Sequence, residues 1–258
     1  MNKSSLLKPK KKWGQHFITD KNTIKKIINL IGPLKNTNIL EIGPGKGALT
    51  LPLSKFVKSI TAIEIDENLA NELKNDSSDK NNITIVNQDI LKFNYNSLNN
   101  AQLDNLFVVG NLPYNISSQI IINLIEFRNY KKLVFMVQKD LANRLLASKS
   151  SKNYSRFSII SQIFFEIEKN FSVSKNIFYP KPNVDSVMIT MKPKKIKTLD
   201  FLKLSTLLKK CFSQRRKKIK NTLSNYVSAD MIKKYGDLRP QDLTTKDFIA
   251  LYNKIIPT

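Results

Sequence analysis

Short apolar runs rich in β-branched residues alternate with amphipathic segments along most of the chain. The apolar runs predict five strands, at 38–42, 59–64, 83–87, 106–110 and 133–138. The amphipathic segments around them predict helices near 21–31, 48–56, 68–74, 117–127 and 139–146. Strands that are apolar along their whole length and alternate with helices are typical of a parallel sheet covered on both faces. The sequence therefore predicts an α/β fold, with two further strands, 166–172 and 187–192, at an antiparallel edge.

The pattern changes after Pro193, where the main strand signals end. Residues 199–255 read as helices, and from residue 192 to residue 220 the chain carries twelve basic residues and one acidic residue, Asp200. The first twelve residues carry five Lys and no acid, which is typical of a basic arm. We therefore predict three parts: the N-terminal arm over 1–12, a Rossmann-like α/β domain over 13–193, and a small all-helical domain over 194–258.

The composition indicates a polyanionic partner and excludes several classes of protein. The 258 residues include 43 Lys and Arg against 20 Asp and Glu, a net charge of +23. A single Cys, Cys211, and a single His, His16, exclude an intrachain disulfide framework and a Cys/His zinc site. The chain has no apolar run of membrane-spanning length and no apolar secretory segment at its start. We expect a cytoplasmic monomer that needs no metal.

A glycine-rich loop, Glu41–Gly47, follows the first predicted strand and opens a predicted helix. Gly43 permits a tight turn, Gly45 lets the backbone approach a ligand, and Gly47 lets the helix pack closely on the strand. A phosphate-binding P-loop is excluded, because Lys46 is followed by Gly and not by Ser or Thr. The loop therefore predicts a site for a nucleoside-containing cofactor.

Carboxylates follow each of the next two predicted strands. Glu64 ends the second strand, where its carboxylate can accept hydrogen bonds from two ribose hydroxyls, and Asp89 follows the third strand, within reach of an adenine edge. The acid before the glycines, Glu41, is typical of the S-adenosylmethionine pattern acid-x-Gly-x-Gly-x-Gly. The loop alone leaves a nicotinamide dinucleotide open as well, because Ala48 can serve as the third small residue of that fingerprint.

A second motif, Asn111-Leu112-Pro113-Tyr114, directly follows the fourth strand and resembles the Asn/Asp-Pro-Pro-Tyr motif of amino-methyltransferases. An exocyclic adenine amine is a poor nucleophile, because its lone pair is delocalised into the ring. The Asn111 side-chain oxygen and the Leu112 carbonyl can accept its two N–H bonds and direct the lone pair at a methyl group. Pro113 would stiffen the turn, and Tyr114 would stack on the extruded base. We predict these four residues to be catalytic.

With these motifs in place, the chain resembles the ribosomal RNA adenine N6-dimethyltransferases, and specifically their small-subunit (KsgA-type) branch. Four further segments resemble family signatures, in the expected order: Trp13–Phe17, Phe178–Ser186, Phe212–Lys217 and Arg239–Leu243. The match covers residues 12–252, which is nearly the whole chain. The resemblance implies a Rossmann-like S-adenosylmethionine-dependent methyltransferase domain with a helical, RNA-binding C-terminal domain.

The resemblance also implies which residues contact cofactor and RNA. It places S-adenosylmethionine against His16, Ile18, Gly43, Gly45, Glu64, Asp89 and Asn111, under an N-terminal arm that folds over the cofactor. His16 stands where Asn is common in the family. A dense basic run without interleaved acids would repel itself unless a polyanion faces it. We therefore expect RNA contacts at Lys209, Lys210, Arg215, Arg216, Lys217, Lys218 and Lys220.

The expected function is dimethylation of N6 on two adjacent adenosines near the 3′ end of small-subunit (16S) rRNA during subunit assembly. That substrate is implied by the resemblance, whereas the residues alone indicate an adenine-type amine and a polyanion. Three alternatives remain: a large-subunit (23S) rRNA adenine methyltransferase of the antibiotic-resistance type, a non-catalytic RNA-binding assembly factor, and a DNA amino-methyltransferase. The last is disfavoured, because the chain has no separate DNA-specificity region.

Overall fold

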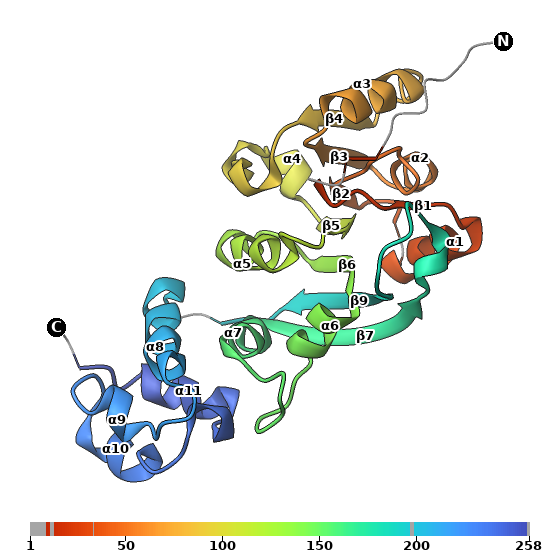
Figure 1. The fold of residues 1–258 in the computed structure, drawn as a ribbon. Coiled ribbons are helices and arrows are strands. Elements are labelled where there is room, and N and C mark those ends of the chain that lie inside the picture. The colour runs from red at the N-terminus through yellow and green to blue at the C-terminus, as the bar shows by residue number, and fades with distance from the viewer. Residues whose placement is uncertain (1–8, 11–12, 33, 197–198, 257–258) are drawn as a thin grey trace. The chain divides into compact units, whose positions relative to one another are not determined.

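The computed structural model describes residues 9–10, 13–32, 34–196 and 199–256. The chain divides into two compact units (Figure 1). The first unit runs to Ala142 and resumes over Glu168–Pro193, and the second comprises Asn143–Ile167 and Lys194–Thr258. Most of the predicted basic arm, residues 1–8 and 11–12, lies outside the described residues.

A seven-stranded sheet forms the centre of the first unit. Its strands lie in the order β4 (Ile83–Asn87), β3 (Ser59–Glu64), β2 (Asn38–Ile42), β5 (Leu106–Asn111), β6 (Lys132–Gln138), β9 (Ser186–Pro193) and β7 (Phe165–Val173). The first five are parallel, and β9 pairs antiparallel with β6. The predicted parallel sheet with an antiparallel edge is therefore confirmed. The strand order reverses between β2 and β5, the place where open α/β sheets bind ligands.

The central strands are buried along their length, as expected for a sheet with helices on both faces. All five residues of β2 are buried, and β3 is buried except at Ser59. Figure 1 shows α4 and α5 on one side of the sheet and α1 and α2 on the other. The helices of this unit are α1 (Lys21–Ile31), α2 (Thr50–Leu53), α3 (Glu67–Asp76), α4 (Asn100–Leu103) and α5 (Ser117–Phe127), with α6 (Lys139–Leu145) crossing into the second unit.

Helix α2 is much shorter than the helix predicted near 48–56. Residues 45–49 form a turn, and the helix covers only Thr50–Leu53. Pro52 has no N–H to donate to the Ala48 carbonyl, so the series of helical hydrogen bonds is interrupted there. The Leu51 amide still donates to the Gly47 carbonyl at 3.0 Å, so a single helical turn precedes the interruption. The Phe56 amide then donates to the Leu53 carbonyl at 2.9 Å, which closes a turn after the helix.

The second unit is helical, with no strand in the described part of residues 199–256 beyond an isolated Val227–Ile255 bridge. It contains α7 (Arg156–Phe164), α8 (Phe201–Ser213), α9 (Lys220–Leu223), α10 (Ala229–Tyr235) and α11 (Thr245–Tyr252).

One segment groups differently from the predicted division at Pro193, because residues 143–167 pack with the C-terminal helices. The Tyr154 hydroxyl donates to the Leu243 carbonyl at 3.0 Å, and the Phe164 ring lies 6.2 Å from the Phe201 ring. Helix α7 buries seven of its nine residues. Such an apolar helix must pack against other elements on more than one face. The hydrophobic pattern along the chain does not indicate which elements these are.

Candidate functional site

A cavity of about 300 Å³ lies where the strand order reverses, and the ends of β2, β3 and β5 contribute to its wall. This volume is at the lower end of the range for small-molecule sites. The cavity brings together residues that are far apart in the sequence. The predicted residues that line it are His16, Ile18, Gly43, Gly45, Glu64, Asp89, Asn111 and Pro113.

At Gly45 and Gly47 the glycine loop packs closely against neighbouring side chains. A Cβ atom on Gly47, which has φ of 74°, would lie 2.4 Å from Cδ1 of Leu73. A Cβ on Gly45 would lie 3.0 Å from the ring of Phe17. The close approach at Gly47 brings the loop against α3, and the one at Gly45 brings it against the N-terminal segment over the cavity.

Glu64 joins the end of β3 to the glycine loop. Its buried carboxylate accepts hydrogen bonds from the backbone N–H of Gly45 at 3.0 Å and of Asp66 at 2.9 Å. Burial raises the pKa of Glu64, and these two amides oppose that rise. A carboxylate has about four acceptor sites, so both oxygens can still accept bonds from a ligand in the cavity.

Glu41 and Asp89 complete the acidic wall. Burial raises the pKa of Glu41 to about 7. The charge of Glu64 adds to this rise, and the Thr50 hydroxyl opposes it. Asp89 lines the cavity, and its Oδ1 also accepts from the Leu91 amide at 2.9 Å, capping the short helix Ile90–Lys92. The described residues contain no group of three or more His, Cys, Asp or Glu arranged to hold a metal ion.

Asn111 lies in the cavity wall and carries an unpaired acceptor oxygen. Its Nδ2 donates to the His16 carbonyl at 2.9 Å, which fixes the orientation of the amide. Its Oδ1 is buried and has no hydrogen-bond partner among the described residues. An unpaired buried oxygen costs free energy unless a ligand satisfies it. The atom therefore fits a ligand that donates an N–H bond.

The turn after Asn111 is held on both sides. The Leu112 amide donates to the Met136 carbonyl at 3.1 Å, and the Pro113 carbonyl accepts from the Ser117 hydroxyl at 2.7 Å. Leu112 is buried beside the cavity and is not part of its wall. These two bonds hold the turn in place after β5.

Tyr114 also lies beside the cavity wall, where it packs against His16. Its ring is stacked on the imidazole, with 5.4 Å between centroids, and its hydroxyl is 2.7 Å from the Ser186 hydroxyl. Burial raises the pKa of Tyr114. His16 Nδ1 is 2.6 Å from the Pro180 carbonyl. The structure thus places the His16 ring against the Tyr114 ring, a contact that the sequence left open.

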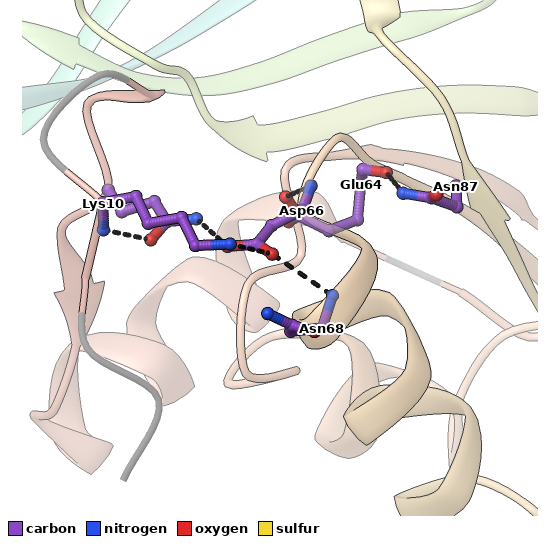
Figure 2. A network of polar contacts seen from close by, with 6 residues as sticks. Lys10, Glu64, Asp66, Asn68 and Asn87 are labelled. Carbon is purple, nitrogen blue, oxygen red and sulfur yellow. Dashed lines mark hydrogen bonds and ion pairs between the residues drawn. The ribbon is translucent and has the colours of Figure 1, made fainter.

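The segment 13–19 forms one side of the cavity and is attached at two places. Strand β1 (Phe17–Ile18) pairs antiparallel with β8 (Phe178–Tyr179). On the other side, Lys10 and Gln15 bond to the buried carboxylate of Asp66 (Figure 2). These contacts of Lys10, Gln15 and Asp66 were not predicted, because an Asp before a helix indicates only an N-cap.

The predicted basic surface of the second unit divides into paired and unpaired side chains. Lys218 and Lys220 form ion pairs with Asp237 at 3.0 and 2.9 Å, and their hydrogen bonds lower the pKa of Asp237 to about 2. Arg215 donates to the carbonyls of Ser151 and Lys152. The ammonium of Lys210 lies 4.8 Å from the Tyr226 ring. The exposed Lys209, Arg216 and Lys217 make no ion pair within the described part of the chain.

Comparisons with known proteins find similarity along nearly the whole chain. The family model described as "Ribosomal RNA adenine dimethylase" matches residues 6–257. A protein of Wigglesworthia glossinidia brevipalpis named ribosomal RNA small subunit methyltransferase A is 44% identical, over 96% of this chain and 98% of its own length. The relative from Buchnera aphidicola with the same name is 40% identical over 95% of this chain and 96% of its own.

Solved structures show the same fold. A dimethyladenosine transferase from Plasmodium falciparum superimposes with a TM-score of 0.81 at 27% identity, covering 93% of this chain and 99% of its own. The 23S rRNA methyltransferase ErmE superimposes with a TM-score of 0.71 at 24% identity, over 92% of this chain and 98% of its own. The second likeness concerns the fold alone. None of the described helices has the length and apolar character of a membrane span.

Proposed function

The chain belongs to the ribosomal RNA adenine dimethylase family, and we propose that it dimethylates N6 of two adjacent adenosines near the 3′ end of small-subunit (16S) rRNA. It is an S-adenosylmethionine-dependent enzyme. The observation that carries the proposal is the buried, unpaired Oδ1 of Asn111 on the cavity wall, oriented by the bond from Nδ2 to the His16 carbonyl.

The cavity residues hold the cofactor, whose sulfonium supplies an electrophilic methyl group when it is bound. We assign the ribose hydroxyls to Glu64, because both of its oxygens are already fixed by backbone amides and still have acceptor sites. We assign the adenine edge to Asp89, whose Oδ1 is occupied by the Leu91 amide. The glycine loop and the segment with His16 and Ile18 enclose the rest of the cavity.

Asn111 activates the target amine by orienting it. Its Oδ1 accepts one N–H of the adenine N6 amine, and the Leu112 carbonyl accepts the other. These bonds would turn the nitrogen lone pair towards the methyl group and stabilise the positive charge that develops on nitrogen as the methyl–sulfur bond breaks and a neutral thioether is left. The methylated nitrogen would then lose one N–H proton to solvent. Because the turn is already held by Met136 and Ser117, the acceptors need little rearrangement during the reaction.

The Tyr114 ring provides the platform for the extruded base. His16 packs against the tyrosine ring, and the Ser186 contact fixes its hydroxyl, so the ring has a defined plane. Stacking on an aromatic ring stabilises a flipped base by about 1–3 kcal/mol. Tyr114 therefore acts by positioning the adenine.

The helical unit binds the rRNA backbone through its basic side chains. We assign the main phosphate contacts to Lys209, Arg216 and Lys217, because they are exposed and carry no internal counter-charge within the described residues. Lys210, Arg215, Lys218 and Lys220 contribute less, since each already has an internal partner. Phosphate contacts position the enzyme, while the flipped base is recognised in the cavity.

The small-subunit substrate is favoured over the large-subunit alternative by sequence similarity. Relatives named for the small subunit reach 44% identity over nearly the whole chain, whereas the likeness to ErmE is one of fold. A non-catalytic assembly factor would have no need to keep the unpaired Asn111 oxygen at the cavity. The proposed setting is an assembling small subunit in the cytoplasm, with the enzyme acting as a monomer and without a metal ion.

The proposal is tested by offering the protein both ribosomal subunits. Purified small and large subunits that lack adenine dimethylation are incubated separately with methyl-labelled S-adenosylmethionine and the enzyme. Label is expected in the small subunit alone, and the Asn111→Ala variant should introduce it roughly 10²–10³ times more slowly, the cost of losing one such group. Label in the large subunit alone supports the antibiotic-resistance type, and label in neither supports the assembly factor.

A further inference from the structure

A buried carboxylate outside the cavity wall binds the N-terminal segment. Asp66 lies just before α3 and its side chain is 4% exposed. Its Oδ1 accepts from the Lys10 ammonium at 2.9 Å, and its Oδ2 accepts from the Gln15 amide at 3.0 Å (Figure 2). Gln15 in turn accepts a bond from the Lys10 backbone N–H at 2.7 Å. The three residues form a closed set of contacts, which we call the arm latch.

The arm latch lies at one end of the segment that covers the cavity. Residues 13–19 line the cavity, and their other end is held by the pairing of β1 with β8 and by the bond from the Thr19 amide to the Ile177 carbonyl at 2.9 Å. The segment is therefore attached to β8 on one side and to Asp66 on the other.

Asp66 also connects to the cavity wall itself. Its backbone N–H donates to Oε1 of Glu64 at 2.9 Å. Burial acts to raise the pKa of Asp66, but the bonds from Lys10 and Gln15 outweigh it and lower the pKa below its ordinary value. The residue is thus a buried anion whose counter-charge comes from the arm.

The N-cap role of Asp66 does not account for this arrangement. The cap uses a single bond, from the Asn68 amide to Oδ1 at 3.2 Å. An N-cap is normally exposed and needs no cation. A buried carboxylate with two partners from a distant segment is costly to leave unpaired, so it favours the closed position of that segment.

We propose that Asp66 is a positioning residue that latches the N-terminal segment over the cavity through Lys10 and Gln15, and so sets the affinity for S-adenosylmethionine. The proposal rests on the proposed function for the identity of the cofactor. A ligand that needs the closed segment binds with an affinity proportional to the closed fraction. Loss of the arm latch lowers that fraction without removing any residue that touches the cofactor.

Three variants separate the latch from other effects. Asp66→Asn removes the charge but keeps the helix cap, because Asn and Asp are equivalent N-caps. Lys10→Met removes the cation from the arm and leaves the body of the fold unaltered. Asp79→Asn is the matched control, since Asp79 forms a close but exposed pair with Lys80 at 2.6 Å and does not line the cavity.

Affinity for S-adenosylhomocysteine is measured by calorimetry. Asp66→Asn and Lys10→Met should each weaken binding about tenfold, which corresponds to about 1.4 kcal/mol. The double variant should be no weaker than either single variant, because both remove the same contact. In methylation assays the KM for S-adenosylmethionine should rise while kcat stays close to that of the unaltered protein.

Trp13 reports the position of the segment directly, because it is the only Trp in the chain and lines the cavity. In the ligand-free protein, Asp66→Asn should increase the quenching of Trp13 fluorescence by acrylamide, because the Trp13 side chain becomes more accessible. Asp79→Asn should leave the quenching unchanged. Lys10 lies 4.5 Å from the Trp13 ring, so the Lys10→Met variant is used for binding alone.

Two results would overturn the latch. One is an affinity loss in Asp66→Asn and Lys10→Met no larger than that of Asp79→Asn. The other is equal quenching of Trp13 in Asp66→Asn and the unaltered protein. If the unaltered protein fails to bind S-adenosylhomocysteine at all, the proposed function fails, and the quenching result still decides whether Asp66 holds the segment.

Discussion

Removing the Asn111 side chain should reduce methyl transfer far more than it reduces cofactor affinity. Asn111→Ala deletes the buried Oδ1 that we assign to the target amine, together with the 2.9 Å bond to the His16 carbonyl. Loss of one preorganised group that stabilises transition-state charge costs about 2.7–4 kcal/mol, or roughly 10²–10³ in rate. Loss of the His16 bond costs only about 0.5–1.5 kcal/mol of stability.

The assay is single-turnover transfer of labelled methyl groups to unmodified small subunits, with both substrates saturating. Asn111→Asp separates the two contributions, because it keeps an acceptor oxygen and removes the Nδ2 donor to His16. Its rate should fall less than that of Asn111→Ala. Asn82→Ala is the control, since Asn82 also donates to a backbone carbonyl, that of Ser54 at 2.8 Å, but does not line the cavity.

The reasoning is refuted if Asn111→Ala transfers methyl groups at a rate close to that of Asn82→Ala. It is also refuted if the rate loss is fully explained by weaker S-adenosylhomocysteine binding. In either case the unpaired oxygen has no part in the reacting centre, and another acceptor must orient the amine.

Three further predictions concern charge. Glu64→Gln should weaken S-adenosylhomocysteine binding in calorimetry and leave RNA binding unchanged. The reason is that one Gln side chain cannot accept both backbone bonds, from Gly45 and Asp66, as the carboxylate does. Unaltered cofactor affinity would contradict the assignment of Glu64 to the ribose. The pKa of Glu41 is about 7 in the folded protein, against 4.5 for an unperturbed carboxyl group. The folded state therefore binds this proton more tightly than the unfolded state does. The resulting stabilisation is fully present below pH 4.5 and is lost as the pH rises through about 7. Glu41→Gln should therefore gain up to about 3 kcal/mol of unfolding free energy over the unaltered protein at pH 8 and little at pH 4, measured by urea unfolding. Replacing Arg216 and Lys217 with Gln should lower the slope of log affinity for RNA against log salt concentration by about 0.7–0.9 per lost phosphate contact. Replacing Lys218 and Lys220, which are paired with Asp237, should change that slope less. Equal slopes for the two double variants would argue against the division into paired and unpaired basic side chains.

Much of the fold could be predicted because periodicity determines it directly. The central strands β2, β3 and β6 are nearly continuous apolar runs, so their positions and their burial on both faces agree with the sequence. The edge strand β4 is at its predicted position but is partly exposed. Helix α2 is the exception within the sheet domain, because Pro52 removes a donor that an apolar pattern does not take into account. The grouping of residues 143–167 was missed because it depends on tertiary contacts such as that of Tyr154 with Leu243.

The cavity wall was predictable to a similar degree, since its residues follow strand ends that meet at one edge of a parallel sheet. What the sequence could not give are contacts between distant polar groups. Nothing in the pattern pairs Lys10 with Asp66, or Lys218 and Lys220 with Asp237, because ion pairs between distant segments leave no periodic signal. The stacking of His16 on Tyr114 likewise depends on where the N-terminal segment lies in the fold.

The central claim is that this chain dimethylates two adjacent adenosines of small-subunit rRNA, and mass spectrometry of the modified RNA tests it most directly. Unmodified small subunits are incubated with the enzyme and S-adenosylmethionine, and the 16S rRNA is digested to fragments and to nucleosides. We expect N6,N6-dimethyladenosine at two neighbouring positions near the 3′ end, and far less of it after the same incubation with Asn111→Ala. Dimethyladenosine elsewhere in the RNA, or methylation of atoms other than N6, would contradict it.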